Sequence, residues 1–276
     1  MPTYVPTFPG IACRVALVTG ANHGIGAASA QQLAAQGAKV LVTSLRLHDE
    51  PDPAVPPAYA ANRAKPADAV VESIRTAGGT AEAVECDLAD PDSAITLFDM
   101  AERLFGPVEI LVNNASAWRA DTFTLAAVDR IGRQTSQVSQ TSFDRMFHVD
   151  ARAAVLLISE FARRHIQRGA TWGRIIGMTS GGPGGFPGEV SYGAAKAAQE
   201  NLTMAAAREL ADHGVTANML YPPVTDTGWV TDEVREAVRT SSEHVHVAHP
   251  DEVAAVIAYL ASDLSRLVTA NLIHLR

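Results

Sequence analysis

The sequence is poor in cysteine and in long apolar runs, and each shortage excludes a class of protein. Only two cysteines occur, Cys13 and Cys86, with no Cys-x-x-Cys pair. We therefore expect a protein of a reducing compartment, the cytoplasm by default, whose two thiols are buried and unbridged. No stretch reaches the ~18 uninterrupted apolar residues that a membrane span requires. Residues 1–10 hold three prolines in place of the basic and apolar regions of a signal peptide.

Charge and histidine content argue against two further classes. The formal net charge is −8 and there is no long run of lysine or arginine, so a nucleic-acid partner is not expected. The nine histidines include His244, His246 and His249, but no carboxylate accompanies these three at ligand spacing. We therefore predict no metal site and interpret the stretch as a mobile lid. Hydrophobic residues make up 47% and charged residues 19%, which is typical of a globular chain with a substantial core.

Short apolar runs alternate with longer helical patterns along the chain. The predicted strands are Arg14–Thr19, Lys39–Ser44, Ala81–Cys86, Glu109–Val112, Gly173–Met178, Val215–Leu220 and Leu267–Ile273, and the predicted helices lie near 25–36, 66–77, 92–105, 142–168, 191–212 and 250–262. Such alternation builds a parallel sheet with helices on both faces. We therefore predict one doubly wound α/β domain of the Rossmann type over residues 11–276, after an N-terminal extension at 1–10.

Two long segments interrupt this alternation. Residues 47–66 contain five prolines, so neither a helix nor a strand is expected to run through them. Residues 117–141 contain Trp118 and many polar residues without a clear period. Loops of this length in a compact domain are usually functional or disordered. Both follow C-terminal ends of predicted strands, where open α/β sheets bind their ligands.

The first predicted strand leads directly into a glycine-rich turn at the start of a helix. Its glycines allow a tight turn, close approach of the backbone to a pyrophosphate, and close packing of helix on strand, while the free N–H groups at the helix start face the anion. A glycine cluster alone also fits an ordinary turn, but its position between strand and helix favours a dinucleotide site. The predicted contacts are Gly20, Asn22, His23, Gly24, Ile25 and Gly26.

The Gly-x-x-x-Gly-x-Gly spacing of this turn resembles the cofactor loop of the short-chain dehydrogenase/reductase family, particularly its 3-oxoacyl-carrier-protein-reductase-like members. The similarity extends from about Arg14 to the C-terminus. It implies that Asp87 and Leu88, after the third strand, contact the adenine ring. It also implies that Asn114 and Ala115, in a segment similar to the family's Asn-Asn-Ala-Gly, pack beside the glycine turn.

The strongest chemical signal is Tyr192-Gly-Ala-Ala-Lys196. Tyr192 and Lys196 are four residues apart in a helical stretch, so they share one face. An isolated tyrosine, with a pKa near ~10, exchanges protons poorly at neutral pH, and a nearby ammonium lowers that pKa. The pair is frequent by chance, but Ser180 follows an apolar strand 12 positions before Tyr192. The resemblance implies that Ser180 holds the substrate oxygen, Tyr192 transfers the proton and Lys196 also binds the nicotinamide ribose; Thr179 is the alternative hydroxyl.

After the sixth strand, Tyr221–Thr227 resembles the family's Pro-Gly-x-x-x-Thr, whose backbone and threonine hydroxyl bind the nicotinamide carboxamide. The implied contacts are Pro222, Val224, Thr225 and Thr227. Pro223 stands where the family has glycine, which restricts φ and removes an N–H donor.

Two further departures concern the catalytic group and the tail. Asp150 stands where the family usually has an asparagine that helps to hold a water molecule beside the lysine. Compared with asparagine, an aspartate keeps a hydrogen-bond acceptor, loses the amide donor and adds a negative charge near Lys196. Because the family position belongs to the catalytic group, we include Asp150 among the predicted catalytic residues. Ala270 replaces a usual glycine, and the sequence ends at Arg276, where relatives continue through a Gly-Gly segment. In the family, that tail commonly contributes to subunit contacts and to one wall of the site, so the resemblance leaves both features open for this chain.

Cofactor preference is predicted from the end of the second strand. NAD-preferring enzymes usually carry a carboxylate there that accepts from the ribose 2′-OH, and this chain has the neutral Ser44. Arg46 lies two residues on, and His23 precedes Gly24, where NADP-preferring relatives often have a basic residue. Because arginine binds phosphate through two parallel hydrogen bonds, we predict NADP(H) as the preferred cofactor, with NAD(H) as the alternative. The competing interpretation is that Arg46 points to solvent and His23 is a neutral loop residue.

The resemblance implies an oxidoreductase that moves a hydride between the nicotinamide and a ketone, an aldehyde or a secondary alcohol. The second hypothesis is a dinucleotide-binding regulatory or redox-sensing protein with little catalysis, which Asp150 and Pro223 keep open. The implied pocket is apolar and partly aromatic, without an obvious carboxylate-binding arginine, and is lined by Trp118, Gly181–Glu189, Trp229, His244 and His246. Helices near 142–168 and 191–212 resemble those that pair subunits in the family, so we expect a homo-oligomer, a dimer or a tetramer.

Overall fold

The computed structural model describes residues 7–47, 54–129, 132–180, 184–242 and 245–276. Seven parallel strands form one sheet in the order β3-β2-β1-β4-β7-β8-β9. In chain order these are β1 (Val15–Thr19), β2 (Lys39–Ser44), β3 (Thr80–Glu85), β4 (Val108–Asn113), β7 (Gly173–Met178), β8 (Val215–Tyr221) and β9 (Leu272–His274). The predicted α/β class and Rossmann-type sheet are therefore confirmed.

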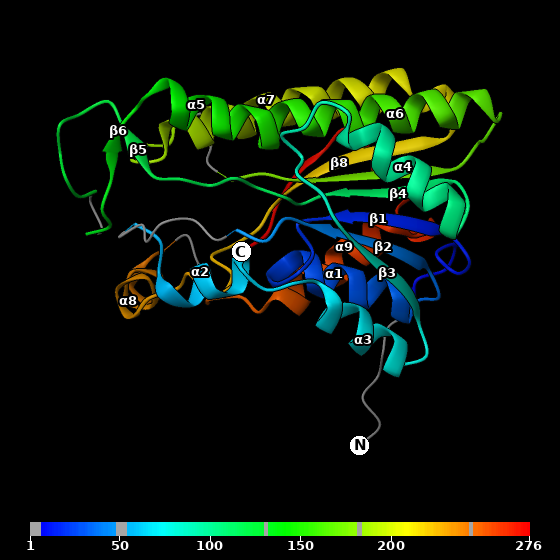
Figure 1. The fold of residues 1–276 in the computed structure, drawn as a ribbon, viewed down its shortest axis with the longest axis horizontal. Helices are drawn as coiled ribbons and strands as arrows, with labels where there is room; N and C mark the ends of the chain where they lie inside the picture. Colours follow the sequence, from blue (N-terminus) through cyan, green and yellow to red (C-terminus); the bar gives the residue numbers. More distant parts are fainter. Residues whose placement is uncertain (1–6, 48–53, 130–131, 181–183, 243–244) are drawn as a thin grey trace.

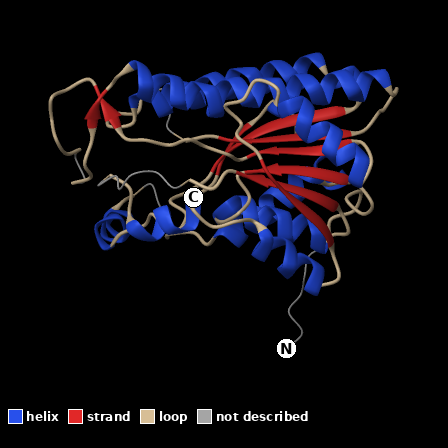
Figure 2. Ribbon diagram, viewed as in Figure 1, coloured by secondary structure: helices blue, strands red, loops and turns tan. Residues whose placement is uncertain are grey.

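Helices cover both faces of the sheet (Figures 1 and 2). One layer contains α1 (Gly24–Ala35), α3 (Asp68–Thr76) and α9 (Pro250–Ala261), and the other contains α4 (Ser93–Leu104), α6 (Ala154–Gln167) and α7 (Val190–Glu209). Because both faces are covered, every residue of β1 is buried. Successive side chains of a strand point to opposite faces, and β1 follows this rule.

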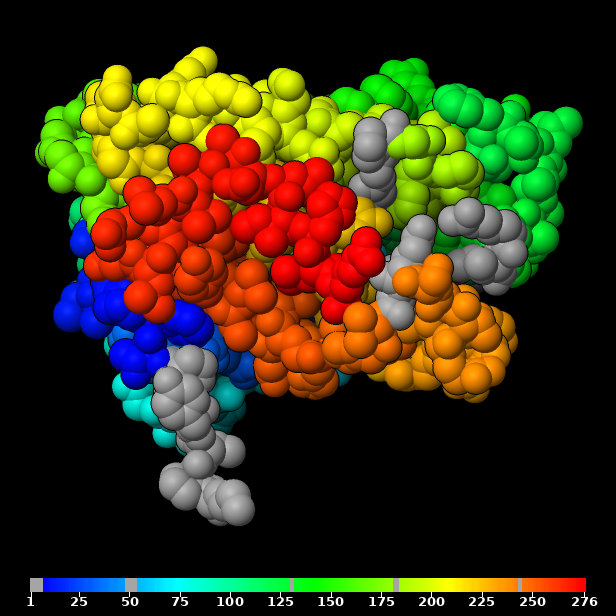
Figure 3. Space-filling model, turned by 180° about the vertical axis from the view of Figure 1, so that it is seen from behind, coloured from blue at the N-terminus to red at the C-terminus, as the bar shows by residue number. Residues whose placement is uncertain are grey.

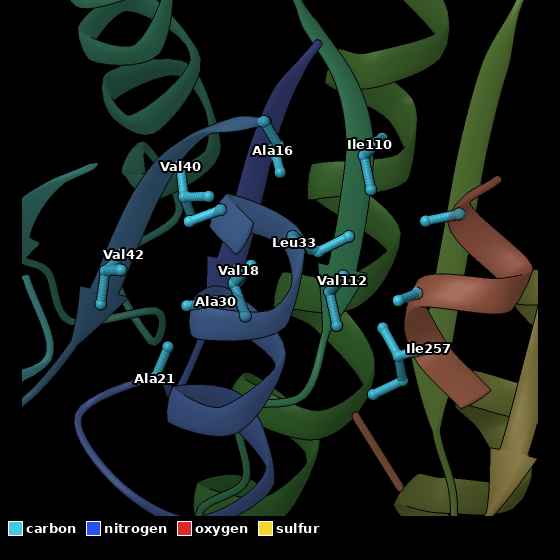
Figure 4. Packing of buried hydrophobic residues seen from close by; sticks show 14 of the residues in the cluster. Ala16, Val18, Ala21, Ala30, Leu33, Val40, Val42, Ile110, Val112 and Ile257 are labelled. Carbon is cyan, nitrogen blue, oxygen red and sulfur yellow. The ribbon is translucent and has the colours of Figure 1, made fainter. Parts of the chain in front are cut away.

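Each helix layer therefore packs on its own set of strand side chains. Ala16 and Val18 face α1 and α9 together with Val40, as the close view in Figure 4 shows. Val15 and Leu17 pack on the opposite layer. On α1, Leu33 is fully buried against the sheet. Replacing a buried leucine by alanine lowers the free energy of unfolding by about 2–5 kcal/mol. Because α1 begins within the glycine turn, the packing of this helix on the sheet also fixes the position of the turn.

Most predicted elements occur within a few residues of their predicted limits. The helix predicted at 142–168 is divided into α5 (Gln140–Met146), a π-helical stretch η1 (Phe147–Ala153) and α6. The strand predicted at Leu267–Ile273 is shorter: the N–H of Val268 bonds to the carbonyl of Ser265 in a turn, and Ala270 has φ +58°. Left-handed backbone is disfavoured for alanine and cannot continue a strand, so β9 begins only at Leu272.

The proline-rich segment contains a helix, contrary to the prediction. Helix α2 spans Pro57–Arg63, with Pro57 at its first position, where the missing N–H costs nothing. The helix α8 (Asp232–Thr240) was also not predicted. In the other irregular segment, β5 (Asp121–Thr122) and β6 (Ser136–Gln137) form a short parallel pair.

The two cysteines are free, as predicted, but they are not buried. Cys13 is exposed and has φ +67°, and Cys86 is partly exposed. Cys13 precedes β1 and Cys86 follows β3, and β2 lies between these two strands, which agrees with the prediction that the thiols are not bridged. Within the residues described, we find no helix that combines the length and the apolar character needed to cross a bilayer.

Candidate active site

A cavity of about 1180 Å³ opens at the carboxyl ends of the parallel strands. Its lining includes residues at the ends of β2, β3, β4, β7 and β8, together with α2, the N-terminal part of α7, and the C-terminal residues. In Figure 1, β5 and β6, to which the loop after β4 leads, lie beyond the left-hand ends of the strands, as do the helices α2 and α8. The long segments that interrupt the helix–strand alternation therefore lie at the ligand-binding edge, as predicted.

The glycine turn at this edge has the geometry that a bound pyrophosphate requires. Gly20 and Gly24 have φ of +62° and +57°, which other residues rarely adopt. A Cβ added to Gly26 would lie 2.3 Å from the carbonyl oxygen of Gly20, so the α1 backbone packs directly on the turn. No side chain caps the N-terminus of α1, so its first N–H groups remain available to an anion. Gly20, Asn22, His23, Gly24 and Ile25 line the cavity, whereas Gly26 packs behind it.

Asn114 and Ala115 fix the turn against β4. The Asn114 side chain donates to the carbonyls of Thr19 and Gly20 at 2.9 and 3.0 Å. The backbone N–H groups of Asn114 and Ala115 both donate to the Thr19 hydroxyl at 3.0 Å. These bonds join the ends of two neighbouring strands, and both residues line the cavity as predicted.

Ser180, Tyr192 and Lys196 come together on one wall of the cavity. Ser180 follows β7 and is hydrogen-bonded to the Tyr192 side chain. The Lys196 ammonium nitrogen lies 5.7 Å from the centre of the Tyr192 ring, as expected for residues one helical turn apart in α7. The alternative hydroxyl, Thr179, is engaged elsewhere because it donates to Glu200. The geometry therefore favours Ser180 over Thr179 as the serine of this group.

Asp150 forms a buried ion pair with the lysine. Its Oδ1 lies 2.9 Å from Lys196 Nζ, and the exposed fractions of the two residues are 1% and 2%. The other carboxylate oxygen accepts from the Ala117 N–H at 2.9 Å, and Lys196 also donates to Gln199 at 3.1 Å. The negative charge predicted near Lys196 is thus in direct contact with it.

This ion pair changes the expected acid–base behaviour of Tyr192. The sequence predicted that Lys196 would lower the tyrosine pKa. Instead, burial raises the pKa of Tyr192 well above its ordinary value, and the charges of Asp150 and Glu189 raise it further. The hydrogen bond with Ser180 acts in the opposite sense but is the smallest of these effects. Burial is the main cause and the Asp150 charge is the second, and together they keep Tyr192 a protonated phenol at neutral pH.

A buried carboxylate that the sequence analysis missed connects three elements beside Tyr192. Asp121 in β5 accepts from the Ser191 N–H at 2.9 Å and from the Ser142 hydroxyl at 2.8 Å, and also from the Ser191 hydroxyl. Asp121 is fully buried. It therefore ties α5 and the start of α7 to the long loop after β4. No local pattern marks it, because its partners lie 21 and 70 residues away.

The adenosine end of the cavity contains some of the predicted residues but not all of them. Ser44, Asp87 and Leu88 line it, and Asp87 accepts from the Ala89 N–H at 2.8 Å. Arg46 is not among the lining residues, because Glu85 holds its guanidinium. The pKa of His23 is lowered to about 4, by burial first and then by the charges of Arg63 and Lys65. His23 is thus neutral at pH 7 and adds no positive charge, in agreement with the competing interpretation.

The nicotinamide end is lined by residues after β8, Pro222, Pro223, Val224, Thr225 and Thr227 among them. The Thr225 hydroxyl donates to the Pro223 carbonyl at 2.8 Å, and the Trp229 indole N–H donates to the Thr225 carbonyl at 2.9 Å. Thr227 lies over the glycine turn, since a Cβ on Gly24 would be 2.8 Å from its methyl group. The threonine is therefore beside the predicted pyrophosphate site.

The C-terminal residues form a further wall. His274 stacks on Tyr221 at 4.9 Å, and the Leu275 N–H donates to the Tyr221 carbonyl at 2.9 Å. His274, Leu275 and Arg276 line the cavity. Figure 3 shows this segment, in red, reaching toward the orange segment that contains α8. His274, Leu275 and Arg276 thus contribute to the wall of the cavity beside Tyr221.

The predicted substrate wall needs two corrections. His246 does not line the cavity, because it pairs with Glu252 at 3.0 Å, and His244 lies outside the described residues. Arginines do line the cavity, Arg63, Arg133 and Arg145 among them, although the sequence indicated none for binding a carboxylate. Trp118 and Trp229 line it as predicted. Across the described part of the chain, no cluster of three metal-ligating side chains occurs.

The residues present fit a dinucleotide. The cavity runs from Ser44 and Asp87, past an uncapped helix start, to Tyr192 and Thr225. The glycine turn leaves room for a backbone-bound pyrophosphate at its middle.

Comparisons with known proteins agree with this geometry. The family described as short chain dehydrogenase matches residues 14–55, and the family described as enoyl-(acyl carrier protein) reductase matches residues 57–275. An uncharacterized oxidoreductase of Bacillus subtilis, YjdA, is 33% identical over 95% of this chain and 94% of its own length. The 3-oxoacyl-[acyl-carrier-protein] reductase FabG of Staphylococcus aureus is 32% identical over 94% of this chain and 95% of its own length.

Solved structures give the same result. The angucycline C-6 ketoreductase LanV with bound NADP superposes with a TM-score of 0.77 at 30% identity, covering 96% of this chain and 95% of LanV. A blue fluorescent protein from a metagenomic library, in complex with NADPH, also gives a TM-score of 0.77, at 28% identity over 96% of this chain and 97% of its own. This chain therefore belongs to the short-chain dehydrogenase/reductase family and is an NAD(P)-dependent oxidoreductase that acts on CH–OH or C=O groups.

Proposed function

We propose that the protein is an NADP(H)-dependent carbonyl reductase in which Tyr192 is the general acid. The observation that carries this proposal is the convergence of Ser180, Tyr192 and Lys196 on the wall of a cavity that begins at the glycine turn. Oxidation of a secondary alcohol is the reverse of the same reaction.

A bound reduced nicotinamide supplies the hydride, and the residues of the chain handle the oxygen and the proton. Ser180 and Tyr192 are hydrogen-bonded to each other, so their hydroxyl groups lie close together. A carbonyl oxygen that replaces this bond would accept one hydrogen bond from each hydroxyl. Tyr192 then gives its proton to the oxygen as negative charge develops there. Lys196 contributes a positive charge that Asp150 partly offsets at 2.9 Å.

The state of Tyr192 favours reduction over oxidation. Burial raises the pKa of Tyr192, so at neutral pH the phenol is in the protonated form from which carbonyl reduction starts, although the higher pKa also makes it a weaker acid. Oxidation of an alcohol needs the phenolate as the base, and the raised pKa keeps that form scarce. We therefore propose carbonyl reduction as the working direction at neutral pH.

NADP(H) is the proposed cofactor, in preference to NAD(H). Ser44 ends β2 without the carboxylate that would accept from a ribose 2′-OH and repel a 2′-phosphate. Two of the similar solved structures contain bound NADP or NADPH, which supports this preference. Ser44, Asp87 and Leu88 are proposed for the adenosine half, the glycine turn with Asn114 and Ala115 for the pyrophosphate, and Tyr192, Lys196, Pro222, Thr225 and Thr227 for the nicotinamide half.

The proposed substrate is a small carbonyl compound with an apolar or aromatic body. Trp118, Phe186 and Trp229 line the cavity with Tyr192. Aromatic walls with a few polar groups are typical of sites that orient small organic ligands. Arg133, which binds Asp129 and Glu189, adds a polar side to this wall.

The test is NADPH oxidation with a panel of ketones and aldehydes at constant pH, with NADH in parallel. We expect turnover with NADPH on at least one aromatic ketone. If both cofactors bind and no carbonyl compound is reduced, the second hypothesis, a dinucleotide-binding regulator with little catalysis, replaces this one. The convergence of Ser180, Tyr192 and Lys196 argues against that hypothesis, because binding alone does not need a proton donor.

A further inference from the structure

The cation that the sequence assigned to the cofactor phosphate is held away from the cavity. Arg46 donates to Glu85 through Nε at 2.9 Å and through a terminal nitrogen at 2.6 Å, and its backbone N–H also donates to Glu85 at 3.0 Å. Both side chains are nearly half exposed. Arg46 would have to break this pair to reach a ligand beside Ser44, and it does not line the cavity.

A different arginine lies at the end of the cavity that contains Ser44. Arg63, the last residue of α2, is 7% exposed and lines the cavity together with Ser44, Leu45 and Leu47. Its backbone carbonyl accepts from the Leu47 N–H at 3.1 Å. The end of α2 is therefore fastened to the chain just three residues beyond Ser44.

The guanidinium of Arg63 lies beside Tyr59 and close enough to His23 for its charge to act on that ring. Its carbon atom lies 5.6 Å from the centre of the Tyr59 ring, and that ring meets the His23 ring edge-on at 5.6 Å. His23 immediately precedes Gly24, and the charges of Arg63 and Lys65 contribute to its lowered pKa. Because His23 is neutral, Arg63 and Lys65 are the cations of this corner.

Helix α2 is itself anchored on the cofactor side of the fold. The Asn22 side chain donates to the carbonyls of Asn62 and Lys65 at 3.3 and 2.8 Å, and Asn62 donates to the Thr227 carbonyl at 3.1 Å. In Figure 1, α2 lies beside α8 below the carboxyl edge of the sheet. Three points of contact thus fix the helix that carries Arg63 between the glycine turn and the segment before α8.

We propose that Arg63, and not Arg46, binds the 2′-phosphate of NADP(H) and sets the preference for it over NAD(H). This inference rests on the proposed function and names the residue behind its cofactor preference. In bound NADP(H) the 2′-phosphate would be carried by the ribose proposed to bind beside Ser44, and the Arg63 guanidinium would be able to donate two parallel hydrogen bonds to it. The interaction is strengthened by burial, since the charges are only weakly screened.

The test is equilibrium binding of NADPH, NADH and adenosine 2′,5′-bisphosphate to the wild type, Arg63→Ala, Arg63→Lys and Arg46→Ala. We expect Arg63→Ala to weaken NADPH and the bisphosphate by at least ~10-fold while NADH changes by less than about 3-fold. Arg63→Lys should lose less, because it keeps the charge without the bidentate geometry. Arg46→Ala, the matched control, should bind all three ligands almost as the wild type does.

Each other result overturns the assignment. Equal losses for NADPH and NADH in both Arg63 variants would mean that Arg63 only supports α2. A larger loss in Arg46→Ala than in Arg63→Ala would return the role to Arg46. A wild type that binds neither nicotinamide cofactor would refute the proposed function itself, which separates that failure from a failure of the Arg63 assignment.

Discussion

Two regions of the cavity, the catalytic wall and the proposed adenosine end, differ in the kind of element that supplies their side chains. The catalytic wall consists of Ser180, at the end of a central strand, and of Tyr192 and Lys196 on one helix, and the spacing of these residues together with the family resemblance predicts them. At the adenosine end, Arg63 comes from a short helix in a proline-rich segment and reaches the site through tertiary contacts. The comparison teaches that residues placed by a regular element can be predicted from the local sequence, whereas a cavity wall supplied by an irregular segment cannot.

The largest expected effect is a loss of stability when the buried ion pair between Asp150 and Lys196 is broken. Asp150→Ala leaves the Lys196 ammonium 2% exposed without its carboxylate partner. Removing one partner of a buried ion pair typically costs about 3–5 kcal/mol of stability. Urea unfolding followed by circular dichroism measures the loss, and Glu82→Ala, which breaks an exposed pair with Arg75, is the control with an expected change below about 1 kcal/mol. Equal losses in the two variants would contradict the difference between a buried and an exposed pair.

The second largest expected effect is a fall in kcat when the proposed proton donor, Tyr192, is replaced. Tyr192→Phe keeps the ring in α7 and removes the transferable proton, so we expect kcat to fall by at least ~100-fold, equivalent to about 2.7 kcal/mol. The affinity for NADPH should change little, because the phenylalanine ring keeps its place in α7 and Tyr192 is only one of many proposed cofactor contacts along the cavity. Steady-state kinetics and cofactor titration check both parts. Near wild-type turnover by this variant would refute the assigned mechanism.

The fold and the catalytic wall were largely predictable, and the reasons are physical. Seven apolar runs alternate with helices because both faces of the sheet are buried, and the glycine turn is marked by close backbone packing at Gly26. Asp121 and Arg63 could not be found in this way, because each acts through partners far along the sequence. The direction of the Tyr192 pKa shift was predicted wrongly, since burial and the Asp150 charge outweigh the lysine.

A smaller change tests the electrostatics of the catalytic wall without removing a side chain. Asp150→Asn deletes a charge that raises the pKa of Tyr192, so that pKa should fall. In carbonyl reduction the protonated phenol is the active form, and activity is lost as the pH rises through its pKa. The alkaline limb of the kcat profile should therefore move to lower pH in Asp150→Asn and stay in place in Glu82→Gln. An unmoved limb in Asp150→Asn would show that Asp150 does not act on Tyr192.

The smallest perturbation concerns the outer face of α7, where Ala194, Ala197 and Ala205 are exposed. We propose that this face pairs two subunits of a cytoplasmic homo-oligomer, because small side chains allow close approach of helices. Ala197→Glu should shift the mass measured by light scattering from oligomer to smaller species at micromolar concentration. Ala77→Glu, on an exposed site at the end of α3, should not. A wild type that is monomeric at this concentration would refute the proposal.

The central claim is that this cavity transfers a hydride from a nicotinamide to a carbonyl carbon with Tyr192 as the proton donor. Its most direct test uses NADPH with deuterium at both hydrogen positions of nicotinamide C4, a ketone from the panel and mass spectrometry of the product. We predict an alcohol that carries one deuterium on the former carbonyl carbon with the wild type, and at most ~1% of that rate with Tyr192→Phe. An alcohol without deuterium, or no alcohol under conditions in which NADPH is bound, would contradict the account.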